Sequence, residues 1–182
     1  MACEPDDLVR KAARIRLLLF DVDGVLTDGR VLLHGDGSES KQFSIRDGTG
    51  IVWAQRAGIA VGLLSARRSA ATAARAAQLG IGIVRQQAGE KLDMYKELTA
   101  LERVDDEAVA FMGDDWLDLP VLGRVGLSAA PCDAAPEVRA RVDWVSRHAG
   151  GAGAARELIE VILRAQGRWD GLLREYVGEA TR

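Results

Sequence analysis

With 182 residues, 48% of them hydrophobic and 28% charged, the chain has the size and composition of a soluble α/β domain with a substantial core. Its net charge of -3 gives no basic footprint and argues against nucleic acid as the main partner. No apolar run approaches the roughly 18 residues that span a membrane, and the acidic first 14 residues do not resemble a signal peptide, so we expect a cytoplasmic protein. The two cysteines, Cys3 and Cys132, predict neither a zinc site nor a structural disulfide.

Short apolar runs that end at glycine or at polar residues predict strands, and helically spaced apolar residues predict the helices between them. In chain order we expect a helical lead-in within 1–14, a strand at 16–21, a β-hairpin at 31–44, a helix at 51–57 and a strand at 59–64. A helix capped by Ser69 and ending near 79, a strand at 81–85, a helix at 91–101 and a strand at 107–112 follow. The last part contains weaker strands at 126–129 and 143–145, a short helix from Pro136, a helix from the 150–153 glycine run to about 165, and a tail, 167–182, with apolar residues at helical spacing.

This order of elements predicts the fold class. Strands that alternate with helices are typical of an α/β protein with a three-layer, doubly wound parallel sheet. We expect one domain over 1–182, with its core at about 15–166 and no linker. The hairpin, whose composition does not demand burial in the main sheet, is expected to project from it.

Two aspartates stand where the first predicted strand ends. Asp21 and Asp23 are separated by one residue, so their side chains point to the same side of an extended chain. Gly24 then allows a sharp turn and a close approach of a ligand to the backbone. Ligands of open α/β sheets bind beyond the carboxyl ends of the strands. The alternative is a simple strand-ending turn, in which Asp and Gly are common.

Polar residues also follow two further strands. Ser65 ends one strand, Asp114 and Asp115 end another, and Lys91 begins a predicted helix between them. If the strands are parallel, these side chains meet at one edge of the sheet. Magnesium prefers carboxylate oxygens together with phosphate and water, and lysine supplies a point charge for phosphate. The sequence therefore predicts a magnesium-dependent phosphoryl transfer.

The order and spacing of these residues resemble those of the conserved motifs of a known superfamily. Its four motifs are matched by Asp21-Val22-Asp23-Gly24-Val25, Ser65, Lys91 and Gly113-Asp114-Asp115, and the chain therefore resembles the haloacid dehalogenase-like phosphatases. Further segments resemble the small capless branch that acts on phosphorylated ulosonates, namely 21–29, 46–48, Arg67 and 150–154. The resemblance extends from about 16 to 166 and implies a Rossmann-like core without a cap domain.

The resemblance implies roles for the motif residues. Asp21 would be the nucleophile that forms an aspartyl-phosphate, and Asp23 would be the general acid and base. Mg²⁺ would be held by Asp21, the backbone carbonyl of Asp23 and Asp114. Ser65 and Lys91 would bind the transferring phosphoryl group.

Other roles concern the supporting residues and the sugar. Asp115 and Asp118 would orient metal-bound waters or the lysine, with a solvated helix face as the alternative for Asp118. The resemblance implies that the substrate is bound by Gly24, Ser44, Arg46, Asp47, Gly48, Ala66, Arg67 and Arg75. For Arg75, which falls within a predicted helix, a surface position is the alternative.

The resemblance also implies a homotetramer in which the hairpins associate and neighbouring chains cover each site. The implied activity is Mg²⁺-dependent hydrolysis of a small phosphorylated sugar acid, with 3-deoxy-D-manno-octulosonate 8-phosphate as the first candidate. Alternatives are a nonulosonate 9-phosphate phosphatase and a non-catalytic oligomerisation or regulatory module. Val52, where a basic residue is expected, and Ala66, where glycine is more familiar, leave the choice of sugar open.

Overall fold

The computed structural model describes residues 5–87 and 89–178, so Cys3 and the last four residues of the predicted tail lie outside the described part. Six strands form one parallel sheet in the order β5-β4-β1-β6-β7-β8. Their bounds are β1 Leu17–Phe20, β4 Ala60–Ser65, β5 Ile83–Gln86, β6 Val109–Met112, β7 Leu127–Ala130 and β8 Trp144–Val145. All six were predicted to within two residues, and the predicted α/β fold class is confirmed.

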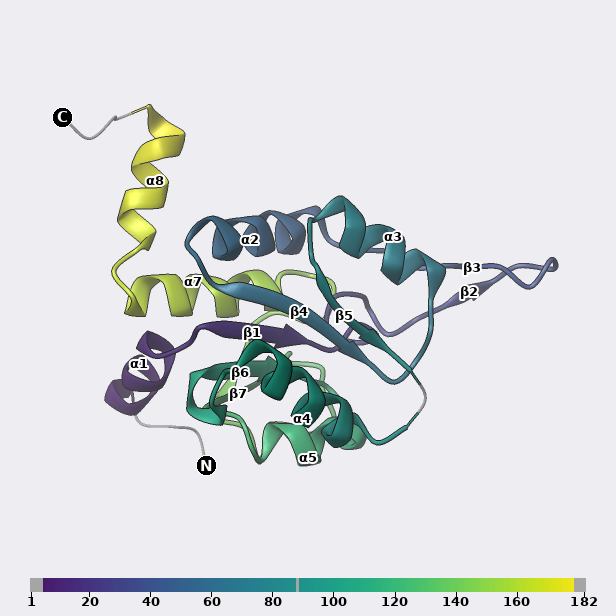
Figure 1. The fold of residues 1–182 in the computed structure, drawn as a ribbon. Helices are drawn as coiled ribbons and strands as arrows, with labels where there is room; N and C mark the ends of the chain where they lie inside the picture. Colours follow the sequence, from purple (N-terminus) through teal and green to yellow (C-terminus); the bar gives the residue numbers. More distant parts are fainter. Residues whose placement is uncertain (1–4, 88, 179–182) are drawn as a thin grey trace.

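Helices cover both faces of the sheet (Figure 1). One face carries α1 (Pro5–Ala13), α2 (Ile45–Arg56), α3 (Ala70–Gln78) and α7 (Ala154–Ala165), and the other carries α4 (Lys91–Glu102), α5 (Leu119–Leu122) and α6 (Pro136–Arg139). Alternation along β1 explains why: Leu18 and Phe20 pack into the first layer, whereas Leu17 and Leu19 pack into the second. A strand buried on both faces requires an unbroken apolar run, which made β1 recognisable in the sequence.

A two-stranded antiparallel hairpin projects from this body (Figure 1). Its strands are β2 (Leu32–Leu33) and β3 (Glu39–Ser40), within the predicted segment 31–44. Between β1 and α2 the described chain contains only this hairpin and its loops, with no cap domain. Short 3₁₀ turns, η1 (Asp106–Ala108) and η2 (Trp116–Asp118), flank β6. No helix in the described part of the chain combines the length and the apolar character needed to cross a membrane.

The predicted start of the second helix was wrong. Helix α2 begins at Ile45, six residues before the predicted position, and Ser44 caps it by accepting a hydrogen bond from the backbone N–H of Asp47. Gly48 and Gly50 concealed this first turn because glycine disfavours helices. Both lie against neighbouring arginines: a Cβ at Gly48 would lie 2.3 Å from Arg75 Nη2. The close approach of other helices, which local sequence does not reveal, explains these glycines.

The tail folds back onto its own chain as α8 (Trp169–Val177). The ring centroids of Trp169 and Tyr176 each lie 5.6 Å from that of Trp53 in α2, in edge-on arrangements. The Trp53 indole N–H donates to the Tyr176 hydroxyl over 2.9 Å, and the Arg156 guanidinium lies over the Trp53 ring at 3.7 Å from its centroid. The aromatic residues of the apolar stripe predicted in the tail thus pack against the protein's own α2.

The glycine run before α7 packs against the loop that follows β1. The N–H of Gly151 donates to the carbonyl of Val25 over 2.9 Å. A Cβ at Gly150 would lie 1.8 Å from the carbonyl oxygen of Gly24, which is an impossible separation. The two backbone segments can meet only because Gly150 has no side chain at this point.

We therefore expect Gly150→Ala to lower the free energy of unfolding by about 1–3 kcal/mol, because either the loop after β1 or the glycine run must shift. Gly150 does not have a positive φ, so the loss would come from space and not from backbone strain. Urea unfolding measures it. The matched control is Gly171→Ala in α8, where nothing lies within 4 Å of the added Cβ and helix propensity predicts a small gain. Equal effects of the two substitutions would contradict the packing argument.

Candidate active site

A cavity of about 280 Å³ lies at the carboxyl ends of the central strands. It is lined by Asp21, Asp23, Gly29, Ser65, Ala66, Arg67, Lys91, Asp114, Asp115, Leu117 and Asp118. The loop after β1 is a tight turn in which three successive N–H groups, from Val25 to Thr27, point to the carbonyl of Val22. The structure thus brings the residues of all four motifs to one place, as parallel strands require.

A buried lysine holds two of the carboxylates together. Lys91 Nζ lies 3.0 Å from Asp21 Oδ1 and 2.5 Å from Asp118 Oδ1, and its side chain is only 4% exposed. Burial lowers the pKa of Lys91, but the negative charges of Asp21 and Asp118 outweigh burial and leave the pKa raised. Lys91 therefore stays charged, and its ammonium group can donate a further hydrogen bond to a phosphate.

Asp118 orients this lysine and the loop after β6. Its Oδ2 accepts hydrogen bonds from the backbone N–H groups of Asp114 and Asp115 over 2.9 and 3.2 Å. The side chain is 1% exposed, so the alternative of a solvated helix face is wrong. Gly113 makes room for it, because a Cβ there would lie 2.5 Å from the Asp118 side chain.

The carboxylates fit a divalent cation. One oxygen each of Asp21, Asp114 and Asp118 lie within 4.8 Å of one another, and Asp114 Oδ1 is buried without a hydrogen-bond partner. Burial, with the charges of Asp21 and Asp118, raises the pKa of Asp114 to about 8. Burial and the charge of Asp118 likewise raise the pKa of Asp21 to about 6. Both oxygens of Asp118 already accept hydrogen bonds, from Lys91 and from the backbone of Asp114 and Asp115. Asp21 and Asp114 are therefore the available ligands, and Mg²⁺ typically takes one or two carboxylates.

Gly24 has a steric role beside this cluster. It has a φ of +89°, and a Cβ there would lie 2.1 Å from Asp114 Oδ2. Glycine thus allows Asp114 to approach the loop after β1. Gly24, which was predicted to contact substrate, does not line the cavity; it is the backbone against which Asp114 packs.

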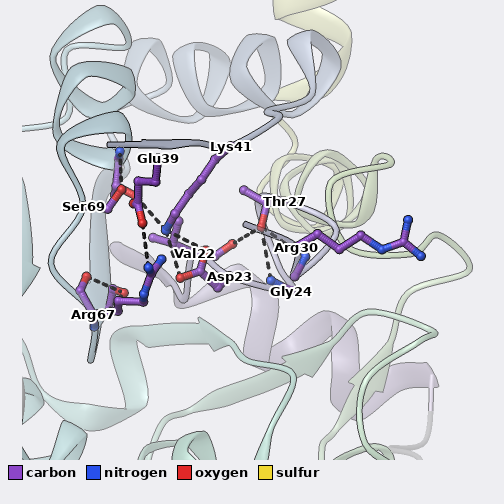
Figure 2. A network of polar contacts seen from close by, with 12 residues as sticks. Val22, Asp23, Gly24, Thr27, Arg30, Glu39, Lys41, Arg67 and Ser69 are labelled. Carbon is purple, nitrogen blue, oxygen red and sulfur yellow. Dashed lines mark hydrogen bonds and ion pairs between the residues drawn. The ribbon is translucent and has the colours of Figure 1, made fainter. Parts of the chain in front are cut away.

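Ser65 and Arg67 form the wall at the end of β4. The Ser65 hydroxyl accepts from the backbone N–H of Arg67 over 3.3 Å and donates to the Arg67 carbonyl over 3.2 Å, which fixes the turn. The Arg67 guanidinium lies 2.6 Å from Glu39 Oε2 of the hairpin (Figure 2). Ala66, between Ser65 and Arg67 in the sequence, also lines the cavity.

Lys41 was missed by the sequence analysis. Its Nζ lies 2.6 Å from Asp23 Oδ1 and 2.9 Å from Oδ2, and its side chain is fully buried (Figure 2). The hairpin composition gave no reason to expect a buried cation. The available signal was the spacing of Glu39 and Lys41, since residues two apart on a strand share a face.

Several residues predicted to bind the sugar do not line this cavity. Asp47 is buried, and its carboxylate accepts from the backbone N–H groups of Gly153 and Arg156 over 3.2 and 2.8 Å, so it caps α7. Burial raises the pKa of Asp47 in spite of these hydrogen bonds. Arg75 donates to the carbonyl of Ser44 over 3.0 Å. Within one chain, the predicted sugar-binding residues outside the cavity are Gly24, Ser44, Arg46, Asp47, Gly48 and Arg75, and Arg46 lines a separate cleft beside α7.

Known proteins share both the sequence and the fold, although no protein-family model matches the chain. The chain is 43% identical over 164 residues to 3-deoxy-D-manno-octulosonate 8-phosphate phosphatase KdsC of Escherichia coli K12, which covers 90% of this chain and 87% of the relative. The crystal structure of the corresponding Yersinia pestis phosphatase superimposes with a TM-score of 0.89 at 42% identity, over 91% of this chain and 90% of the other. A Moraxella catarrhalis phosphatase of the same name, in complex with a magnesium ion, a phosphate ion and KDO, has a TM-score of 0.92 at 32% identity, over 95% and 99%.

A hydrolase of the haloacid dehalogenase superfamily from Legionella pneumophila shares this fold with a TM-score of 0.91 at 36% identity, over 95% of each chain, and this is the class of enzyme to which the fold leads. Within that superfamily the chain belongs to the 3-deoxy-D-manno-octulosonate 8-phosphate phosphatase family. It is therefore a phosphoric monoester hydrolase, and the acidic cluster fits the Mg²⁺ on which the class depends.

The raised pKa of Asp114 predicts that the metal-free protein loses stability as pH rises and that Mg²⁺ offsets this loss. Without divalent cations, the folded state keeps the proton of Asp114 up to about 8, whereas the unfolded chain loses it near 3.8. The folded state then binds more protons, so the free energy of unfolding should fall as pH rises through this window, by at most about 1.4 kcal/mol per pH unit for one carboxyl. Mg²⁺ replaces the proton, so it should raise the melting temperature more at about pH 8 than at about pH 5.

Thermal unfolding with EDTA or with Mg²⁺ at both pH values tests this expectation. Asp114→Asn should remove most of the pH dependence and of the Mg²⁺ effect. Asp93→Asn is the matched control because Asp93 is 67% exposed on α4. An equal Mg²⁺ effect at both pH values would show that the proton and the metal do not compete for this carboxyl.

Proposed function

We propose that the chain hydrolyses 3-deoxy-D-manno-octulosonate 8-phosphate to the free sugar acid and inorganic phosphate. The observation that carries this proposal is the assembly of Asp21, Asp23, Ser65, Lys91 and Asp114 around one cavity. The identity to enzymes named for this substrate, over nine-tenths of the chain, supports the choice of sugar. A cytoplasmic location agrees with a water-soluble, phosphorylated substrate.

The proposed reaction begins with Asp21. Its carboxylate attacks phosphorus, the bond between phosphorus and the sugar oxygen breaks, and Asp23 gives a proton to the departing alcohol. Asp23 then takes a proton from the water that cleaves the aspartyl-phosphate. Lys91 and the hydroxyl of Ser65 hold the phosphoryl oxygens. Bound Mg²⁺, held by Asp21, Asp114 and the backbone carbonyl of Asp23, would supply the positive charge that offsets repulsion between carboxylate and phosphate.

The sugar end is proposed to lie toward Arg67. A guanidinium can pair with the carboxylate of a sugar acid through two hydrogen bonds, and Arg67 and Ala66 line the cavity. Ser44, Asp47, Gly48 and Arg75 would act indirectly, because their contacts fix the start of α2 and its union with α7.

We also infer that the chain, as one domain, assembles into a homotetramer through its hairpin. Leu32 and Leu33 are 63% and 71% exposed in the single chain, on an element that projects into solvent. Trp116 and Leu117, at the rim of the cavity, are 59% and 67% exposed. Exposed apolar residues on a projecting hairpin and beside the cavity favour association, and a neighbouring chain would cover the open side of the cavity.

Phosphate release across a panel of phosphorylated sugars, with and without Mg²⁺, tests the proposed activity. We expect the octulosonate 8-phosphate to be hydrolysed with a specificity constant at least about tenfold above that of any nonulosonate 9-phosphate, a difference of about 1.4 kcal/mol in transition-state binding. Asp21→Asn should retain the fold and release no phosphate, because an amide cannot act as the nucleophile.

Other outcomes would contradict the proposal in different ways. Preference for a nonulosonate 9-phosphate would assign the other sugar class and would make Val52 and Ala66 candidates for specificity. Near wild-type activity of Asp21→Asn would show that another group is the nucleophile. Absence of release from every substrate, with Mg²⁺ still bound, would favour the non-catalytic module.

The assembly has its own test. Sedimentation velocity should give the mass of four chains for the wild type, and Leu33→Glu should weaken association by at least about tenfold, since a buried carboxylate at the interface is costly. Leu101→Glu is the matched control, because Leu101 is 68% exposed on α4, away from the hairpin. A monomeric wild type, or equal dissociation in both variants, would argue against assembly through the hairpin.

A further inference from the structure

Lys41 is a buried cation for which the proposed reaction has no use. Its side chain is 0% exposed, and its Nζ contacts both carboxylate oxygens of Asp23 and lies 3.4 Å from Thr72 Oγ1. A buried ammonium group is costly unless it is paired and hydrogen-bonded, so its place in the structure depends on Asp23. The pair joins two segments 18 residues apart, the loop after β1 and the base of the hairpin.

A second contact fixes the base of the hairpin from the other side. Glu39 lies 2.6 Å from Arg67 in the loop after β4, and the Ser69 side chain donates a hydrogen bond that lowers the pKa of Glu39. Figure 2 shows the two contacts side by side, Lys41 toward Asp23 and Glu39 toward Arg67 and Ser69. The end of β3 is thereby attached to both loops that border the cavity.

The carboxyl group of Asp23 needs such a restraint. It lies on a turn that continues through Gly24 at positive φ, its side chain is 24% exposed, and Lys41 is the one ion-pair partner it has among the described residues. A general acid must lie within hydrogen-bond reach of the leaving oxygen, and a misplacement of about 1 Å can cost about a hundredfold in rate. Contact with both oxygens limits the rotation of the carboxyl group.

We propose that Lys41 is a positioning residue for proton transfer: it holds the Asp23 carboxyl group toward the cavity and so makes the hairpin part of the catalytic apparatus of its own chain. The inference rests on the proposed phosphatase reaction, in which Asp23 protonates the leaving alcohol. It predicts that Lys41 matters only when the leaving group needs a proton.

The test uses the full-length, Mg²⁺-loaded enzyme and two kinds of substrate. Nitrophenolate leaves p-nitrophenyl phosphate without protonation, whereas the alcohol of a sugar phosphate that the wild type hydrolyses requires a proton. Single-turnover rates of bond cleavage are measured by rapid mixing for Lys41→Met, Lys41→Arg and the control Lys96→Met, whose ammonium group is exposed on α4.

We expect Lys41→Met to lower the sugar phosphate rate by about 10- to 100-fold and the nitrophenyl phosphate rate by less than about threefold, within the range that general acid catalysis supplies. Lys41→Arg should recover most of the loss, and Lys96→Met should change neither rate. In an Asp23→Asn background, Lys41→Met should lower the sugar phosphate rate by less than about twofold further, because a residue that acts through Asp23 has no effect once Asp23 is removed.

Equal losses with both substrates, no loss with either, or a full additional loss in the Asp23→Asn background would each overturn the inference. If Lys41→Met does not fold, Lys41→Gln decides, because its neutral amide keeps hydrogen-bond donors but loses the charge that pairs with Asp23. It should still slow the sugar phosphate selectively, and an equal slowing of both substrates would refute the role. A wild type that cleaves neither substrate would instead contradict the proposed function itself.

Discussion

The site depends on the pairing of one buried ammonium group with carboxylates from different strands. Lys91 comes from the start of α4, Asp21 from the end of β1, and Asp118 from the turn after β6. Without the lysine, the carboxylates would repel one another in a region of low dielectric. Asp118 transmits the pairing further, since its second oxygen ties down the backbone that presents Asp114. Asp114 is left with a buried oxygen that has no hydrogen-bond partner, and this oxygen is available as a ligand for a cation.

A second set of contacts, made by α2, α7 and the glycine run before α7, supports the loop after β1. Asp47, at the start of α2, caps α7 from another element, and the glycine run that precedes α7 donates a backbone hydrogen bond to Val25. The position of Asp23 is therefore set by α7 on one side and by Lys41 of the hairpin on the other. Residues that do not touch the cavity thus influence its shape, which explains how motif-like residues such as Asp47 can be structural in a single chain.

The sheet and the cluster of carboxylates and lysine at its edge could be predicted because each depends on local sequence. Buried parallel strands require unbroken apolar runs, and the polar residues that end them must meet at one edge. What the sequence concealed depends on contacts between distant elements. Gly48 made the first turn of α2 look non-helical, because glycine is needed there only for the close approach of Arg75 from α3. Lys41 was missed because its partner, Asp23, lies 18 residues away in the loop after β1. The set of predicted sugar-binding residues came from the resemblance, and the structure brings only Ala66 and Arg67 of that set to the cavity.

The aromatic contacts of α8 have a practical consequence. Helix α8 lies at the opposite end of the sheet from the hairpin and from the carboxyl end of β1, where the cavity lies (Figure 1). The edge-on packing of Trp169 and Tyr176 on Trp53 keeps it there. A label, a surface linkage or a fused protein attached through the end of α8 would therefore point away from the cavity and from the exposed leucines of the hairpin. Single-molecule or immobilised formats can be built from that end of the molecule without an attachment near the cavity.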